Sequence, residues 1–436
     1  MSRRVVITGI GVVSPLGNSP AAVWESLAAA RSGVEPLTQL PPLADRITFG
    51  GECRHFAGEI DDFGPLEKDV KKAIRKALKM MCRESMMAVA AAQQAIANAG
   101  FDTTPMDPDS SGVVFGSDYM LSPPDDLLAG MVKCGAAAGA FDFARWGRDG
   151  LREMNPLWML SYLPNMPASH IAIFNDLRGP NNSLTMREAS SLLAIREAAQ
   201  TIARGHADRM VAGATGTRLH SFKTIHALQH EQLADPGCAP HQASRPFDAG
   251  RTGMVLGEGA GALLLEESQA AQARGATIYA EVIGTGSSAC LSTATDGDCQ
   301  AALTVAARAA LAEAECSGKA LGHINAHAAG AVEGDAAEAA ALAEAVGPGL
   351  AQVPVVAAKS YFGNLGAGGG AVETIASLLA FQHDRLFATL NYETPDPRCA
   401  LNTTRNGDHS PGQTCLKLSV TPQGQAAAVV LQRVDA

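Results

Sequence analysis

The chain has 436 residues, 47% of them hydrophobic, and its 44 acidic residues exceed its 34 lysines and arginines to give a net charge of −10. The apolar content is enough for a large core and excludes a chain that is disordered throughout. The acidic balance gives no general attraction to nucleic acid or to an anionic membrane, and we exclude both as partners. No apolar stretch approaches the roughly 18 residues of a membrane-spanning helix, so we expect a cytoplasmic protein.

Apolar runs typical of β-strands alternate with alanine-rich helical stretches along the chain. In the first half, the predicted strands are Val5–Thr8, Gly112–Phe115, Arg209–Gly213 and Ala260–Leu265, and the predicted helices include Ser85–Ala99 and Ala189–Arg204. In the second half, the predicted strands are Ile278–Ile283, Ile324–Ala326, Val353–Ala357, Leu416–Val420 and Ala427–Gln432, with helices Cys299–Ala314, Glu333–Ala345 and Gly370–Phe381. The alternation predicts an α/β protein with parallel strands joined by crossover helices.

The two halves share this pattern, which changes near residues 274–277. We interpret the chain as a duplicated βα unit, divided into residues 1–270 and 271–436. Two proline-containing stretches, 119–168 and 384–412, are predicted to be long loops. Loops of that length inside a compact domain usually carry function or form an interface.

Six basic residues within twelve positions stand out from the acidic background. They are Lys68, Lys71, Lys72, Arg75, Lys76 and Lys79. On a helix most of them would share one face. The simplest interpretation is a solvated helix face, and the functional alternative is a docking patch for an acidic partner.

No motif for a cofactor or a metal is complete. Gly9-Ile10-Gly11 lacks the third glycine of a dinucleotide-binding turn, because Ser14 stands in its place. His226 and His230 have the spacing of a zinc-binding helix, but the glutamate that should follow the first histidine is Ala227. The nine cysteines include no CxxC pair. We therefore expect no cofactor, no metal and no disulfide framework.

A long string from Ser244 to Gly253, SRPFDAGRTG, is followed by the glycine-rich segment GEGAG at 257–261. Together they resemble the signature of β-ketoacyl-acyl-carrier-protein synthases, the thiolase-fold ketosynthases. The other matching segments, in chain order, are VVITGIGVVSPLG at 5–17, GPN at 179–181, NAH at 325–327, Gly334-Asp335 with Glu338, Lys359-Ser360 with Gly363, and GAVE at 370–373. The resemblance covers essentially the whole chain. It implies two similar five-stranded βα halves in α/β/α/β/α layers, and a dimer across a central sheet edge. It also implies acyl carrier protein or coenzyme A thioesters as partners.

The family's chemistry needs three features. A cysteine at a helix N-terminus takes the acyl chain as a thioester. Two histidines polarise the malonyl thioester, and a Gly-Phe-Gly-Gly loop gates the pocket. Here Glu188 occupies the cysteine position, Asn364 the second histidine position and residues 421–424 the place of the gating loop. The first histidine matches His327, but the Gly-Thr-Ser-Thr that normally follows it is Ala-Ala-Gly-Ala at 328–331.

The charged side chains that support the family's active site, here called the framework ions, are kept in this sequence. Lys359 is kept together with Asp335, Glu338 and Glu373. In the two-half interpretation, residues 1–270 carry the nucleophile position and the long loop insertions. Residues 271–436 carry the positions of His327, Lys359 and Asn364.

A carboxylate at position 188 cannot form a stable thioester, and the helix N-terminus should keep it ionised. Two interpretations stay open. In the first, Glu188 caps its helix and fills a vestigial site, where it can form an ion pair with His327. In the second, Glu188 acts as a general base or stabilises His327 as an acid. His327 has either a structural role or a role as an acid or base. Asn364 can still donate one hydrogen bond to a substrate carbonyl. Ser190 and Ser191 are weaker nucleophile candidates, because neither sits at the elbow position.

Three functions follow, and they leave open whether the chain is an enzyme. In the first, the chain resembles a chain length factor, a ketosynthase-like subunit without the cysteine that pairs with an active ketosynthase. In the second, Glu188, His327 and Asn364 act on a carrier-bound or coenzyme A thioester by hydrolysis or decarboxylation. The third is ordinary condensation, although no cysteine lies near the elbow. The chain is expected to form a homodimer or a heterodimer with an active ketosynthase. Under each of the three functions the basic helix is expected to dock the carrier protein near the pocket mouth.

Overall fold

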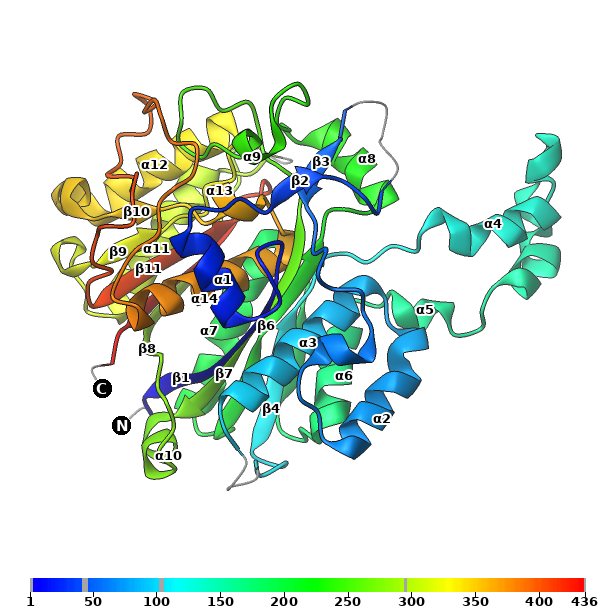
Figure 1. Cartoon of the computed structure of the whole chain (residues 1–436), viewed down its shortest axis with the longest axis horizontal. Coiled ribbons are helices and arrows are strands. Elements are labelled where there is room, and N and C mark those ends of the chain that lie inside the picture. Colours follow the sequence, from blue (N-terminus) through cyan, green and yellow to red (C-terminus); the bar gives the residue numbers. More distant parts are fainter. Residues whose placement is uncertain (1–2, 41–45, 102–105, 294–295, 435–436) are drawn as a thin grey trace.

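The computed structural model describes residues 3–40, 46–101, 106–293 and 296–434 (Figure 1). Its centre is a ten-stranded sheet with the order β10-β9-β11-β12-β8-β1-β7-β6-β4-β5. The strands of the first half are β1 (Val5–Val13), β4 (Ser111–Gly116), β5 (Asn181–Leu184), β6 (Arg209–Thr217) and β7 (Glu258–Glu267). Those of the second half are β8 (Ala280–Ala289), β9 (His323–Asn325), β10 (Val355–Val356), β11 (Thr414–Val420) and β12 (Gln425–Gln432).

The strand order shows the duplication directly. Read outward from the centre, the first half runs β1-β7-β6-β4-β5 and the second runs β8-β12-β11-β9-β10. Each half has antiparallel pairs near the centre and parallel pairs at the outer edge. The fold class expected from the resemblance is therefore confirmed, while the division at residue 270 stays a prediction.

The expectation of parallel strands holds at the two outer edges of the sheet and is wrong at its centre. β1, β7, β8 and β12 pair antiparallel with their neighbours. One cause is visible between β11 and β12, which are joined only by residues 421–424, too few for a crossover helix. The sequence pattern also missed β5, since a polar strand of four residues has no apolar alternation.

Six helices form three layers around the two halves of the sheet (Figure 1). The outer layers are α3 (Arg83–Asn98) with α6 (Met166–Asn175), and α11 (Cys299–Glu313) with α12 (Val332–Val346). α7 (Ser190–Ala203) and α14 (Gly369–Gln382) lie between the halves, and α14 is buried from Gly369 to Phe381. The predicted helices agree with these bounds to within a few residues.

Glycines in the central strands allow the outer helices to approach very closely. A Cβ added at Gly11 in β1 would lie 2.0 Å from the carbonyl oxygen of Ala91 in α3. A Cβ added at Gly286 in β8 would likewise lie 2.0 Å from the carbonyl oxygen of Ala306 in α11. The same close approach in both halves accounts for part of the glycine and alanine content of the chain.

The other helices and strands lie outside these three helix layers. They are α1 (Pro20–Ala28), β2 (Val34–Pro36), β3 (Phe49–Gly51), α2 (Lys68–Ala77), α8 (Ser221–His230), α9 (Pro240–Ala243), α10 (Ser268–Ala273) and α13 (Lys359–Phe362). All four residues of α13 are buried. In the part of the chain that the structure describes, no helix has both the length and the apolar character to cross a membrane.

One segment projects from the body as an arm (Figure 1). It contains α4 (Pro124–Lys133), a series of short turns and α5 (Trp158–Ser161). The expectation of an irregular loop at 119–168 is thus wrong in part, because this stretch is largely helical. The second predicted loop is irregular, since no named element lies between α14 and β11.

Candidate functional site

Glu188 lies in a sharp turn between β5 and α7. The turn is a short 3₁₀ segment, Arg187–Ala189, and Arg187 has a left-handed backbone with φ of 47°. A non-glycine residue in that conformation costs roughly 1–3 kcal/mol and is kept only where its surroundings impose it. The Glu188 side chain is buried, and only 2% of the residue is exposed.

The Glu188 carboxylate is held by two arginines and an amide. Arg218, which follows β6, forms a buried ion pair and hydrogen bond with Oε1. Asn364 donates from Nδ2 to the same oxygen at 3.2 Å, and Arg187 Nε lies 3.5 Å from Oε2. The side chain therefore does not cap α7, contrary to one of the sequence interpretations.

A fourth charged group, Glu231, completes this cluster. Arg218 bonds to Glu231 at 2.8 Å, and Arg187 also bonds to Glu231. Burial alone would raise the pKa of Glu188, but Arg218 and Arg187 outweigh it and lower the pKa to about 2. Two arginines thus match two carboxylates, and Glu188 and Arg218 are buried whereas Arg187 and Glu231 are partly exposed. We call these four residues the 188 cluster: Arg187, Glu188, Arg218 and Glu231.

His327 lies beyond β9 and is buried with its loop. Burial, followed by the positive charge of Lys359, lowers the pKa of His327 well below its ordinary value, so the ring is neutral. Lys359 Nζ lies 3.4 Å from Nδ1 and donates to the His327 carbonyl at 2.8 Å. The ion pair between Glu188 and His327 considered from the sequence is not formed, because arginines have taken the carboxylate.

The predicted framework ions lie directly behind His327. Glu373, fully buried, binds Lys359 at 2.6 Å and also Lys417 at 2.5 Å. Glu338 accepts from the backbone N–H groups of His327 and Ala328 at 2.6 and 2.7 Å.

Asp335 holds the same region from the other side of the loop. It accepts from the backbone of Gly330 at 3.0 Å and of Phe247 at 2.9 Å. Burial raises the pKa of Asp335 to about 7 and also raises that of Glu338. These carboxylates fix the backbone around His327, and Asp335 also lines the cavity beside it.

A cavity of about 290 Å³ reaches the predicted site. Glu188, His327 and Asn364 line it, together with Met254, Cys299 and Pro422. Lys359 does not line it, and neither do Ser190 and Ser191, whose hydroxyls donate to backbone carbonyls. The structure therefore brings three of the four predicted residues to one cavity and places Lys359 behind His327.

The place of the family's gating loop is a tight hairpin turn between β11 and β12. Gly424 N–H donates to the Thr421 carbonyl at 3.0 Å and closes the turn. Thr421 and Pro422 line the mouth of the cavity. A turn closed in this way has little freedom to swing open and shut.

The basic helix lies elsewhere. α2 packs against α6 and the turn at 60–63, whereas the cavity is lined by the end of α8, the start of α12 and the turn after β11 (Figure 1). Five of the six basic side chains are exposed, and Lys71 pairs with Asp61 at 2.8 Å. The basic patch and the cavity therefore lie on different elements, and the role of the patch in docking a carrier protein stays a prediction.

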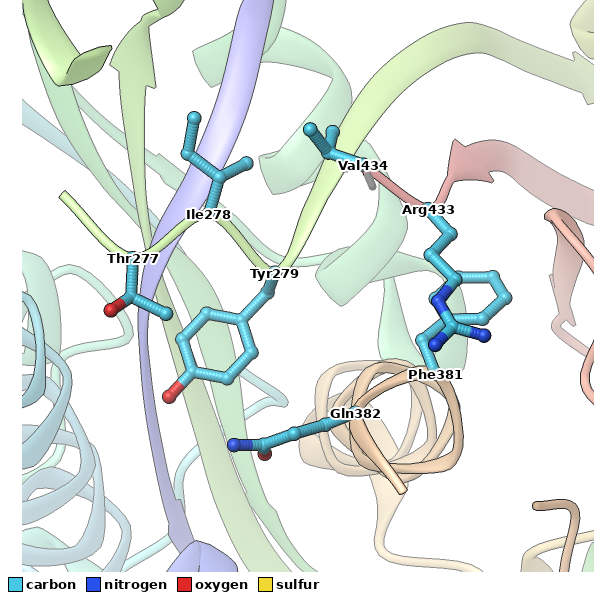
Figure 2. A pocket seen from close by; sticks show the side chains of 7 residues that line it. All are labelled: Thr277, Ile278, Tyr279, Phe381, Gln382, Arg433 and Val434. Carbon is cyan, nitrogen blue, oxygen red and sulfur yellow. The ribbon is translucent and has the colours of Figure 1, made fainter. Parts of the chain in front are cut away.

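A second hollow of about 240 Å³ lies near the C-terminal end of α14 (Figure 2). It is lined by residues 277–279, Phe381, Gln382, Arg433 and Val434. None of the predicted site residues lies there, and Arg433 is already paired with Asp384. It offers no chemistry comparable to that of the cavity at Glu188.

Comparison with known proteins decides the family. The profile described as the N-terminal domain of beta-ketoacyl synthases matches residues 2–271, and that of the C-terminal domain matches residues 279–393. The chain belongs to the β-ketoacyl synthase family. Among curated β-ketoacyl synthases, it is 33% identical to 3-oxoacyl-[acyl-carrier-protein] synthase 2 of Coxiella burnetii, over 93% of this chain and 92% of that one. It is also 33% identical to the enzyme of the same name from Vibrio harveyi, over 90% and 89% of the two chains.

Solved β-ketoacyl synthase structures have the same fold. A beta-ketoacyl synthase from Burkholderia phymatum matches with a TM-score of 0.84 and 27% identity, over 99% of this chain and all of that one. The ishigamide ketosynthase/chain length factor matches with a TM-score of 0.83 and 26% identity, over the whole of both chains. A structure described as a type II polyketide synthase carrier protein in complex with its ketosynthase has the same TM-score and identity, again over the whole of both chains.

Sequence reasoning missed the charged partners of Glu188 in this member of the β-ketoacyl synthase family. A buried carboxylate needs a counter-charge, so an arginine near position 188 could have been expected. Arg218 could have been identified as this counter-charge, because it is an isolated cation at the end of a strand made of small residues. Lys417 was missed too, because a lysine in a predicted strand ordinarily faces solvent.

Glu188→Cys should give a thiol with a pKa below its ordinary value of about 8.5, since the two arginines would favour the thiolate as they favour the carboxylate. The measurement is the pH dependence of iodoacetamide alkylation at residue 188, located by peptide mass spectrometry. Cys299 is the internal control: it lines the same cavity, but burial and Asp298 raise its pKa. Equal alkylation rates for the two thiols near pH 7 would contradict the electrostatic account.

Proposed function

We propose that this β-ketoacyl synthase is a non-condensing subunit of fatty-acid or polyketide-type acyl chain assembly, acting as a chain length factor does beside an active ketosynthase. The observation that carries the proposal is the 188 cluster. Where the family places a nucleophilic thiol, this chain has a carboxylate locked to Arg218 and Asn364. An ionised carboxylate paired with arginine neither forms a stable thioester nor attracts the carboxylate of a malonyl group.

A surface suited to a partner subunit supports the proposal. β5 ends the sheet and pairs only with β4 in the described residues, so its outer edge is free to pair with another strand. The arm leaves the body after β4 and returns at α6, which packs on β5. Nine large apolar side chains are exposed on it: Leu128, Met131, Val132, Phe141, Phe143, Leu151, Leu157, Met159 and Leu160. An apolar surface of that extent usually marks a protein interface.

The structural neighbours point the same way. One is described as a ketosynthase/chain length factor, and another as a carrier protein in complex with its ketosynthase. We infer that the partner of this chain is a cysteine-containing ketosynthase and that the pair receives its substrates on an acyl carrier protein.

The test is co-expression with each cysteine-containing ketosynthase encoded beside this chain, followed by affinity purification and mass measurement. A one-to-one complex is the expected result. Leu128→Asp with Phe143→Asp should reduce its yield at least tenfold, because each change buries a charge in the interface. Val305→Asp, an exposed apolar residue on α11 away from the arm, is the matched control. A strict homodimer under every co-expression would reject the proposal.

We propose that α2 docks the acyl carrier protein for the assembled pair. Lys72→Glu with Arg75→Glu should weaken carrier binding about tenfold or more in low salt and less in high salt, since the interaction is screened. Binding is measured by titration of the complex with carrier protein. Arg308→Glu on α11 is the control, because that residue is exposed on another part of the surface. Unchanged affinity after the double reversal would remove α2 from the docking site.

A second function is favoured by one observation, the cavity that reaches His327 and Asn364. These side chains would act on a carrier-bound or coenzyme A thioester, with Asn364 donating to the carbonyl. A carboxylate with a pKa of about 2 is a poor general base, which weighs against a direct role for Glu188. Purified chain is incubated with a panel of thioesters. Turnover that His327→Ala abolishes would establish this function, and absence of turnover would reject it.

A further inference from the structure

Glu188 and Glu231 both line the cavity, and each forms an ion pair with Arg218. Glu188 lines the cavity, whereas Arg218, its ion-pair partner, does not. The Arg218 side chain is only 6% exposed and lies between the carboxylates of Glu188 and Glu231. The guanidinium therefore lies directly behind two carboxylates of the cavity wall.

Arg218 is closely surrounded by a glycine and a further buried carboxylate. Gly366 has no side chain, and a Cβ there would lie 3.0 Å from Asp118 Oδ2 and 3.7 Å from Arg218 Cγ and Nε. Asp118 adds a third nearby carboxylate, and it is also buried. Arg218 Nε has no hydrogen-bond partner. The guanidinium is thus kept in a packed interior even though one of its donors is unsatisfied.

We propose that Arg218 and Glu188 together close the interior of this subunit to an acyl chain, with Arg218 as the residue that fills the space. The inference rests on the proposed function, because it explains how a subunit of acyl chain assembly keeps the growing chain out of its own body. Displacing Arg218 would leave buried carboxylates without a counter-charge, so a hydrocarbon does not compete with it. The ligand excluded is a neutral chain of medium length.

Two double variants of the whole chain separate volume from charge. Glu188→Ala with Arg218→Ala removes one anion, one cation and most of both side chains. Glu188→Gln with Arg218→Met removes the same charges but keeps the volume. Binding of N-phenyl-1-naphthylamine is followed by fluorescence, and displacement by 1-dodecanol shows that the dye occupies a site for hydrocarbon.

The alanine pair is expected to bind dodecanol at least tenfold more tightly than the native chain, and the Gln/Met pair to bind it no more tightly. The proposal would be overturned if the two double variants bound dodecanol equally, or if the native chain bound it as tightly as the alanine variant. It would also be overturned if the alanine variant folded but bound no dodecanol. If the alanine pair does not fold, Glu188→Gln with Arg218→Gln opens less space and allows the same comparison with 1-octanol. The assay uses the purified chain alone, so its failure leaves the co-purification test of subunit pairing unaffected.

Discussion

Arg218→Ala is expected to lower the free energy of unfolding by about 3–5 kcal/mol, because it leaves Glu188 and Glu231 with only the partly exposed Arg187 between them. Arg187 alone cannot match both carboxylates, and its Nε is already 3.5 Å from Glu188. Unfolding in urea, followed by circular dichroism, measures the loss. Glu188→Gln with Arg218→Met should recover most of it, since no buried charge is then unpaired. A loss below about 1 kcal/mol for Arg218→Ala would contradict the account of the 188 cluster.

The pH dependence of this effect has a defined sign. The pKa of Glu188 falls from 4.5 to about 2 on folding, so its ion pair stabilises the native chain fully above about pH 4.5. That contribution is lost as the pH falls toward about 2. Without Arg218, burial would raise the pKa instead, and acid would relieve the penalty by protonating Glu188. The difference in stability between the native chain and Arg218→Ala should therefore shrink from about pH 7 to about pH 4. A constant difference would mean that the arginine acts through packing alone.

Glu373→Gln is the second change with a large expected effect. Glu373 and Lys417 are both fully buried, and the Glu373 carboxylate is shared by Lys359 and Lys417. Removing it leaves two buried ammonium groups facing each other, which should cost about 3–5 kcal/mol or prevent folding at neutral pH. Denaturant unfolding and the yield of folded protein measure the effect.

Lys417→Met is the matched control for Glu373→Gln. It keeps the Lys359–Glu373 pair and replaces a lysine, whose pKa burial lowers, with an apolar side chain of similar length. Replacing a buried ion with a packed apolar group is often neutral or stabilising. A change within about 1 kcal/mol is therefore expected. Equal losses for the two variants would show that Lys417 is needed for its hydrogen bonds to the backbone of Asn325 and Ala326.

Long, strongly patterned elements could be predicted from the sequence, and short or polar ones could not. α11 and α14 were placed within one residue at each end, because their alanine-rich apolar runs are unmistakably helical. β5 could not be predicted, because a polar strand of four residues has no apolar pattern and is defined only by its pairing with a neighbouring strand. Strand direction at the sheet centre depends on how each connection folds back, and apolar periodicity carries no information about that.

The candidate site shows a similar division. The positions of Glu188, His327 and Asn364 followed from motif spacing, and the structure brings all three to one cavity. The state of Glu188 did not follow from spacing. It depends on Arg218, thirty residues further along the chain, which reaches position 188 only because β6 ends beside the turn that carries it. Charge pairing of this kind is a property of the folded chain.

The most direct test of the account is to locate the acyl group in the assembled pair. The complex of this chain with its ketosynthase is incubated with acylated carrier protein, and the intact mass of each subunit is measured. The acyl group is predicted on the ketosynthase cysteine alone, this chain should keep its native mass, and condensation should stop when that cysteine is replaced by alanine. An acyl adduct on this chain, or condensation that survives the loss of the partner's cysteine, would contradict the claim that this subunit does not condense.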